Sequence, residues 1–175
     1  MLSIRQLHKT YRQAAEPSLS GLSIDFDDHI IAGLLGPNGA GKTTTISIIC
    51  GLVKADEGHV EVLGMDINKD AEAIKKAIGV VPQSIALYPT LTVTENLEYI
   101  GKLYGLKSSV IREKTSHYLH LFGLEKSTDK AIRHFSGGMK RRANIIASLL
   151  HDPQLLILDE PTAGVDVQSR NMILK

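Results

Sequence analysis

One short segment restricts the fold of this chain more than any other. Residues 36–43, Gly-Pro-Asn-Gly-Ala-Gly-Lys-Thr, match the pattern G-x-x-x-x-G-K-[ST]. They follow an apolar run, Ile30 to Leu35, and precede a stretch of helical character from Lys42 to about Cys50. An unbroken apolar run of this length is typical of a strand buried on both faces of a parallel sheet. The order of strand, glycine-rich loop and helix predicts a phosphate-binding loop in an α/β fold.

The residue types of this loop suit the binding of phosphate groups. Small residues let backbone amides curl around a phosphate, and the helix N-terminus adds positive potential. We expect Lys42 to reach the β- and γ-phosphates of a nucleotide and the Thr43 hydroxyl to ligate Mg²⁺. A coincidental match in a glycine-rich turn is the alternative, and the flanking strand and helix argue against it. The predicted nucleotide-binding residues are Gly36, Pro37, Asn38, Gly39, Ala40, Gly41, Lys42, Thr43 and Thr44.

A second apolar run, Leu155 to Leu158, ends in two carboxylates, Asp159 and Glu160. In a parallel sheet the carboxyl ends of the strands face the ligand crevice. We therefore expect Asp159 to hold Mg²⁺ through water and Glu160 to polarise an attacking water as general base. Taken alone, these residues also fit a strand that leaves the core for solvent. The phosphate-binding loop earlier in the chain favours the ligand role.

Composition and charge limit the function classes. The sequence has 20 Lys and Arg against 19 Asp and Glu, so its net charge of +1 predicts no basic surface for nucleic acid or anionic membrane. Cys50 is the single cysteine, which excludes an intrachain disulfide. With no secretory leader at the start, this favours a reducing, cytosolic compartment. The apolar runs are too short to span a bilayer, so any membrane role is expected to be peripheral.

The middle of the chain is expected to be helical, from Thr92 to Phe122, beginning with a capping box at Thr92 to Glu95. A further helix is predicted from Gly137 to Leu150, directly after Phe-Ser at 135–136. The hydroxyl of Ser136 and the unhindered amides after it predict a second anion site at a helix N-terminus. Two such helix ends in one chain suggest that two copies sandwich a nucleotide. The basic run 140–142 is interpreted as a solvated face or a partner contact.

The ordered series of motifs resembles the ATP-binding cassette (ABC) ATPases, over essentially the whole chain. The resemblance implies an α/β fold: a P-loop NTPase core with a mainly parallel sheet, an N-terminal antiparallel β part and an inserted α-helical subdomain. It also implies one incomplete nucleotide-binding domain, in which 1–82 and 131–175 form the ATP-binding core and 83–130 the helical subdomain. The motifs that carry the resemblance are Gly36–Thr43, Gln83, Phe135–Met139, Leu155–Glu160 and Asp166.

The resemblance also implies roles for single residues. Tyr11 matches the aromatic residue that stacks on adenine, and Gln83 matches the glutamine that senses the γ-phosphate and Mg²⁺ and couples to the transmembrane partner. Asp166 matches the aspartate of the D-loop at the dimer seam. The signature residues, which contact the γ-phosphate bound to the other subunit, are Ser136, Gly137 and Gly138. The implied catalytic residues are Glu160, Lys42 and Gln83, and the implied metal ligands are Thr43, Gln83 and Asp159.

The implied function is that of an ATPase subunit that powers transport at the cytoplasmic face of a membrane, with ATP and Mg²⁺ as cofactors. Its implied partners are a second cassette, in a homo- or heterodimer, and a multi-span permease that docks on the helical subdomain; no nucleic acid is expected. The signature has Phe135 where leucine is usual and Met139 where glutamine is usual. In this form, the stretch 135–142 is similar to export-type (ABC-2-like) cassettes.

Two other interpretations stay open at this point. A soluble ABC ATPase could act on ribosomes or DNA, although no heptad pattern is sustained between Lys42 and Ser136 and one cassette is visible. A nucleotide-binding fragment without turnover is the second, because the family places a histidine switch beyond a further strand and no histidine follows Asp159. The sequence stops within a predicted helix at 171–175. We therefore expect this chain to bind ATP with little steady-state hydrolysis and to expose apolar edges.

Overall fold

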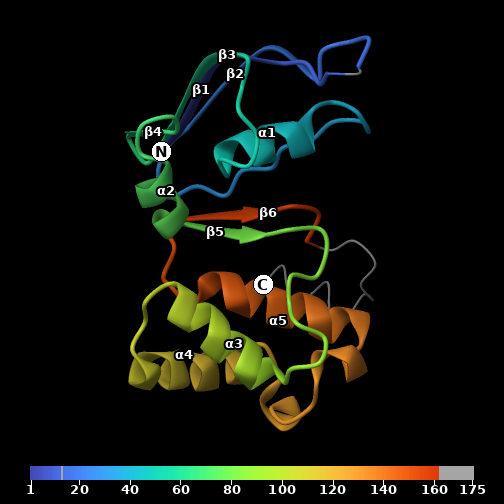
Figure 1. Cartoon of the computed structure of the whole chain (residues 1–175), viewed down its shortest axis with the longest axis vertical. Helices are drawn as coiled ribbons and strands as arrows, with labels where there is room; N and C mark the ends of the chain where they lie inside the picture. Colours follow the sequence, from blue (N-terminus) through green and yellow to red (C-terminus); the bar gives the residue numbers. More distant parts are fainter. Residues whose placement is uncertain (13, 162–175) are drawn as a thin grey trace. The chain divides into compact units, whose positions relative to one another are not determined.

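The computed structural model describes residues 1–12 and 14–161. The chain divides into two compact units, the first from Met1 to Ile78 and the second from Gly79 onward. Each unit is described by itself, and Figure 1 follows the helices and strands along the chain. Of the helices in these described ranges, none is long and apolar enough to cross a membrane.

The first unit contains an antiparallel sheet with the strand order β2-β1-β3-β4. Ile4 in the central strand β1 pairs with Ile24 on one side and with Val60 on the other. Ile4 and Val60 are almost fully buried because paired residues of neighbouring strands point to the same face of the sheet. The register shifts between Ile4 and Leu7, and Leu7, three residues further along, is buried as well. The strands are β1 (Leu2–Lys9), β2 (Leu19–Phe26), β3 (Glu57–Val62) and β4 (Met65–Asp66).

The predicted strand from Ile30 to Leu35 is wrong in this structure. These residues have no assigned strand and all of them are exposed, with Ile31 and Leu35 at 105% and 92% of their reference surface. A strand buried on both faces needs hydrogen-bonded neighbours at both edges and layers above and below it. In the described part of the chain, neither sheet includes this segment.

Two helices complete the first unit, α1 (Lys42–Ile49) and α2 (Ala71–Ala77). Helix α1 begins and ends as predicted, because Cys50 caps it and Gly51 follows with a φ of +67°. Ile48 and Ile49 at its C-terminal end are buried, and so is Ile74 of α2. The helix that follows the glycine-rich loop is thus anchored by its last turn, while its first turn carries the loop.

Strand β5 (Ile78–Val81) lies in the second unit apart from its first residue, and it pairs with β6 (Leu155–Leu158). The two strands run in the same direction (Figure 1). The amide of Asp159 donates to the carbonyl of Val81 at 2.9 Å, which brings the carboxyl ends of both strands together. Strand β6 is only half-buried, with Leu158 at 40% exposure, so the prediction that it is a buried strand is wrong in the described structure.

The remaining elements of the second unit are helical: α3 (Val93–Leu103), α4 (Ser108–Leu121), α5 (Gly137–Leu149) and the short 3₁₀ turns Glu125–Ser127 and Ile132–His134. The capping box at the start of α3 is confirmed. The Thr92 hydroxyl accepts from the amide of Glu95 at 3.2 Å, and the Glu95 carboxylate accepts from the amide of Thr92 at 2.8 Å. These bonds satisfy amides that a helix N-terminus would otherwise leave unpaired. The hydrogen bonds that the Glu95 carboxylate accepts from the amide and the hydroxyl of Thr92 lower its pKa.

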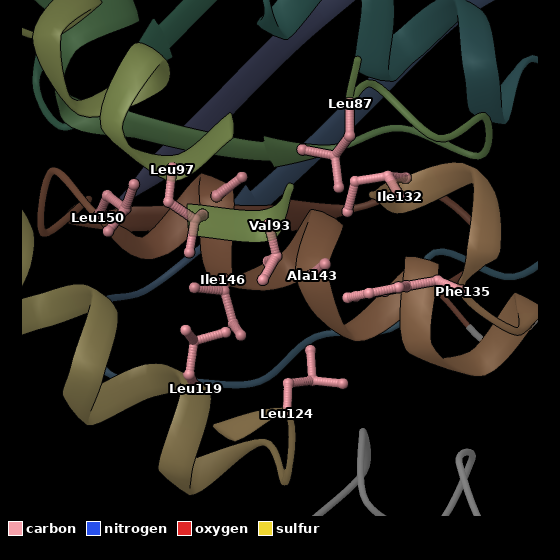
Figure 2. Close-up of a cluster of buried hydrophobic side chains, with 11 residues drawn as sticks. Leu87, Val93, Leu97, Leu119, Leu124, Ile132, Phe135, Ala143, Ile146 and Leu150 are labelled. Carbon is pink, nitrogen blue, oxygen red and sulfur yellow. The ribbon is translucent and has the colours of Figure 1, made fainter. Parts of the chain in front are cut away.

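A cluster of buried apolar side chains gathers between α3, α4 and α5 (Figure 2). It draws on the predicted helical subdomain at 83–130 and on α5, whose residues lie outside that subdomain. The subdomain boundaries themselves stay a prediction. The cluster consists of Leu87, Val93, Leu97, Leu119, Leu124, Ile132, Phe135, Ala143, Ile146, Ala147 and Leu150.

Asn96 of α3 is fully buried and closes the loop before the helix. Its Oδ1 accepts from the amide of Tyr88 at 2.7 Å, and its Nδ2 donates to the carbonyls of Tyr88 at 3.1 Å and Thr92 at 2.9 Å. Replacing Asn96 by alanine leaves these backbone groups unpaired in a dry environment.

We expect Asn96→Ala to lower the free energy of unfolding by about 1–3 kcal/mol, measured by urea denaturation. Glu98→Ala is the control, because it removes an exposed ion pair with Lys102 on the same helix and should cost about 0.5 kcal/mol or less. Equal effects of the two substitutions would show that the buried amide does not hold this loop.

Candidate nucleotide-binding site

The predicted phosphate-binding loop has the backbone conformation that its glycines permit. Gly39 and Gly41 have φ values of +85° and +81°, in the left-handed region that glycine enters without strain. At Gly41, a Cβ atom would lie 2.5 Å from both the carbonyl oxygen of Ser18 and Cδ2 of Leu19. The loop therefore packs closely against the start of β2 immediately before α1 begins.

Lys42 turns back over the loop that precedes it. Its Nζ donates to the carbonyls of Gly36 at 2.7 Å and Pro37 at 2.9 Å. No side chain in the described ranges caps the N-terminus of α1, so the amides of its first turn keep their donor capacity. A helix end with free amides and an adjacent ammonium group is suited to an anion such as phosphate. Thr43 follows at an exposed position.

Tyr11 lies close to the predicted loop helix within the first unit. Its hydroxyl is 3.5 Å from the hydroxyl of Thr44, and the residue is 42% exposed. Lys9 places its Nζ 5.9 Å from the centre of the ring. Asp56 holds Lys9 at 2.7 Å and the amide of Thr10 at 2.7 Å, and these hydrogen bonds lower the pKa of its carboxyl. The ring is thus presented on an ordered strand end, although its stacking on adenine stays a prediction.

The second unit brings Gln83 and Glu160 together. Gln83 donates from Nε2 to the carboxylate of Glu160 at 2.9 Å, across two segments that follow paired strands. Asp159 lies directly before Glu160 and is fixed through its amide by the strand pairing. Glu160 itself has a φ of +48°, which is costly for a residue with a side chain, and it precedes Pro161. The sequence assigned these residues to one site, and the structure joins Gln83, Asp159 and Glu160.

The signature segment forms the start of α5. The Ser136 hydroxyl accepts from the amide of Met139 at 3.2 Å as the helix cap, as predicted. Phe135 is 5% exposed and belongs to the buried cluster, so this departure from the usual leucine serves as an apolar anchor for the helix end. Gly137 is exposed and Gly138 is buried. Asp166, the predicted D-loop residue, lies outside the described residues.

Arg141 corrects the interpretation of the basic run as a solvated face. Its side chain is 3% exposed, and burial lowers the pKa of the guanidinium while the charge of Asp159 opposes that shift. Asn144, one turn further along α5, is also buried. Sequence reasoning missed both contacts with the site. The available signal was the spacing of Arg141, Asn144 and Ser148, which places three polar residues on one face of the helix.

The two glycines of the loop allow a matched test of its packing. We expect Gly41→Ala to destabilise the first unit more than Gly39→Ala, because both substitutions force a side chain into the left-handed region but only Gly41 also meets neighbouring atoms. Gly39→Ala should cost about 1–2 kcal/mol in the free energy of unfolding, measured by urea denaturation. Equal losses would show that the loop does not pack against β2 as described.

Comparison with known proteins agrees with this arrangement. The sequence pattern of the family described as ABC transporter matches residues 19–163. The chain is 49% identical over 175 residues to the linearmycin resistance ATP-binding protein LnrL of Bacillus subtilis, covering 100% of this chain and 56% of that protein. It is 40% identical over 173 residues to the Nod factor export ATP-binding protein I of Ralstonia nicotianae, covering 99% and 53%. The chain thus spans about half the length of these curated relatives.

A solved structure shows the same fold. It is a dimeric, post-hydrolysis state of an ATP-binding cassette bound to ADP and Pi, and it superposes with a TM-score of 0.87 at 26% identity. The match covers 99% of this chain and 80% of that one. The α/β fold of P-loop NTPases is therefore confirmed. Because the family pattern matches most of its residues, this chain belongs to the ABC transporter family.

Proposed function

We propose that this chain is the nucleotide-binding part of a membrane transporter that binds and hydrolyses ATP, and that the chain alone binds ATP with little turnover. The contact between Gln83 and Glu160 carries this proposal, because it joins a proposed sensor of the nucleotide to a proposed general base. The family membership and the relatives named for resistance and export support it. The alternative that the chain works on ribosomes or DNA draws no support from the described contacts.

The proposed binding step uses the first unit. The amides of 36–43 and the helix end of α1 receive the phosphates, and Lys42 exchanges its contacts with Gly36 and Pro37 for phosphate oxygens. This exchange replaces two carbonyl acceptors by charged ones, and hydrogen bonds between charged groups are the stronger kind. Thr44 and Tyr11 lie beside the same helix start and complete the proposed nucleotide contacts.

The proposed chemical step uses the second unit. Glu160 accepts a proton from the attacking water, and Gln83 holds the carboxylate through its Nε2. Phosphoryl transfer depends mainly on positioning and on electrostatic stabilisation, so a carboxylate with a fixed direction suits this role. Lys42 is the proposed source of positive charge at the transferred group.

The side chains named for Mg²⁺ fit the needs of that ion in chemical type. A hydroxyl, a carboxylate and an amide oxygen from Thr43, Asp159 and Gln83 are hard donors, as Mg²⁺ prefers. Among the described residues no group of three His, Cys, Asp or Glu could form a metal cage. A sparse set of protein ligands is usual where the phosphates of the substrate supply the rest. When bound, the ion would neutralise charge on the phosphates.

The proposed working unit is a pair of cassettes that closes on ATP, with Ser136, Gly137 and Gly138 of each facing the nucleotide of the other. The dimeric solved structure of a similar cassette supports this pairing. A permease with several membrane spans is the proposed second partner and places the pair at the cytoplasmic face of the membrane. The relatives' names favour export as the direction of transport.

We expect Glu160→Gln to reduce steady-state ATP hydrolysis by about a hundredfold or more in the native protein purified with the partners it retains, since the amide cannot accept the proton. ATP binding should persist, because the proposed phosphate contacts lie elsewhere. Glu98→Gln is the matched control, an exposed carboxylate on α3, and should keep its turnover.

The two readouts separate the outcomes. Unchanged hydrolysis in Glu160→Gln would remove Glu160 as general base. Loss of ATP binding when Lys42→Ala is introduced without Glu160→Gln would support the assignment of 36–43 as the phosphate-binding loop. Undiminished ATP binding would contradict it.

A further inference from the structure

The buried guanidinium of Arg141 binds main-chain carbonyls on two separate segments. In the described part of the chain its hydrogen bonds go to four such carbonyls. Nη1 donates to the carbonyl of Pro82 and to that of Gln83, the latter at 3.2 Å. Nη2 donates to the carbonyl of Asp159 at 2.8 Å, and Nε donates to that of Pro161 at 2.9 Å. Backbone carbonyls are the acceptors here, so the contact fixes the path of the chain rather than a side chain. One planar group thus joins the segment after β5 to the segment after β6.

The four carbonyls bracket the two residues proposed for chemistry. Asp159 and Pro161 lie on either side of Glu160, while Gln83 provides a carbonyl of its own. Glu160 has a φ of +48° directly before a proline, a conformation that costs free energy and persists only when its surroundings hold it. The guanidinium holds the carbonyl of the residue on each side of Glu160.

Asn144 extends the same contact along α5. Its Oδ1 accepts from the amide of Ala86 at 3.0 Å, and its Nδ2 lies 3.5 Å from the carbonyl of Ser84. Arg141 and Asn144 therefore fix the loop from Pro82 to Ala86 at several points on one face of the helix. Since Phe135 and Ile146 anchor α5 in the buried cluster, the loop follows the position of that helix.

We propose that Arg141 is a positioning residue for hydrolysis: it holds the backbone around Glu160 and Gln83 so that their side chains meet at the geometry needed for the reaction. Within the described ranges, the hydrogen bonds of Arg141 go to backbone carbonyls and none goes to the side chain of Glu160. Arg141 acts through the backbone. When its guanidinium is removed, the Gln83 side chain and the Glu160 carboxylate can move apart. This inference rests on the proposed function.

The experiment compares variants of the native protein, each purified with the partners it retains. Arg141→Gln should lower kcat for ATP by about tenfold to a hundredfold, because small displacements of a reacting group reduce rates by this order. KM and the equilibrium dissociation constant of ATP should change less than about twofold. Lys114→Gln is the matched control, since Lys114 donates to the carbonyl of Leu150 at the other end of α5; it should leave kcat unchanged.

A double substitution distinguishes positioning from a separate effect. If Arg141 acts through Glu160, Arg141→Gln should not reduce the single-turnover rate further in a protein that already carries Glu160→Gln. Hydrogen exchange of the segment 82–87 should rise in Arg141→Gln and not in Lys114→Gln. Should Arg141→Gln fail to fold, Arg141→Lys carries the same comparison, because one ammonium group cannot span four carbonyls.

The results also separate this inference from the proposed function. Native turnover in Glu160→Gln would contradict the proposed function. Loss of turnover in Glu160→Gln with native kcat in Arg141→Gln would overturn the positioning role alone. A parallel loss of ATP affinity and kcat in Arg141→Gln, or an equal further loss in the double variant, would likewise overturn it and leave Arg141 a structural residue.

Discussion

The burial of helix α5 determines where the polar groups of the second unit lie. Its apolar residues pack with α3 and α4 in one buried cluster. Because rotating or sliding the helix would expose these side chains to water, its position is fixed. The polar side chains of the helix are therefore held at fixed positions. Ser136 caps its start, and Arg141 and Asn144 hold a loop along its side.

Helix α5 links the signature motif to the segments that carry Gln83 and Glu160, which the family resemblance treats as separate motifs. The signature begins α5, and the same helix holds the backbone of Gln83 and of the acidic strand end. A shift of the helix start would therefore reach Glu160 and Gln83 through their backbone. The buried charge of Arg141 is stabilised by carbonyl dipoles, and leaving those carbonyls unpaired would be costly.

Local signals in the sequence predicted much of the structure. The glycines of the loop, the capping box at Thr92 and the cap at Ser136 were predictable because each depends on neighbours within a few residues. The prediction of a strand from Ile30 to Leu35 was wrong because a strand buried on both faces depends on partners distant in the sequence. Arg141 was missed for a related reason, since its four acceptors come from two loops that the sequence alone does not bring together.

The central claim is that ATP joins two cassettes through the phosphate-binding loop of one and the signature of the other. Sedimentation velocity of the native protein carrying Glu160→Gln tests it most directly, with Mg²⁺ and either ATP or ADP, and again after adding Ser136→Glu. The account predicts a paired species with ATP but not with ADP. This species should be lost when a negative charge replaces the Ser136 hydroxyl. Sedimentation that is the same with ATP and ADP, or pairing that survives Ser136→Glu, would contradict it.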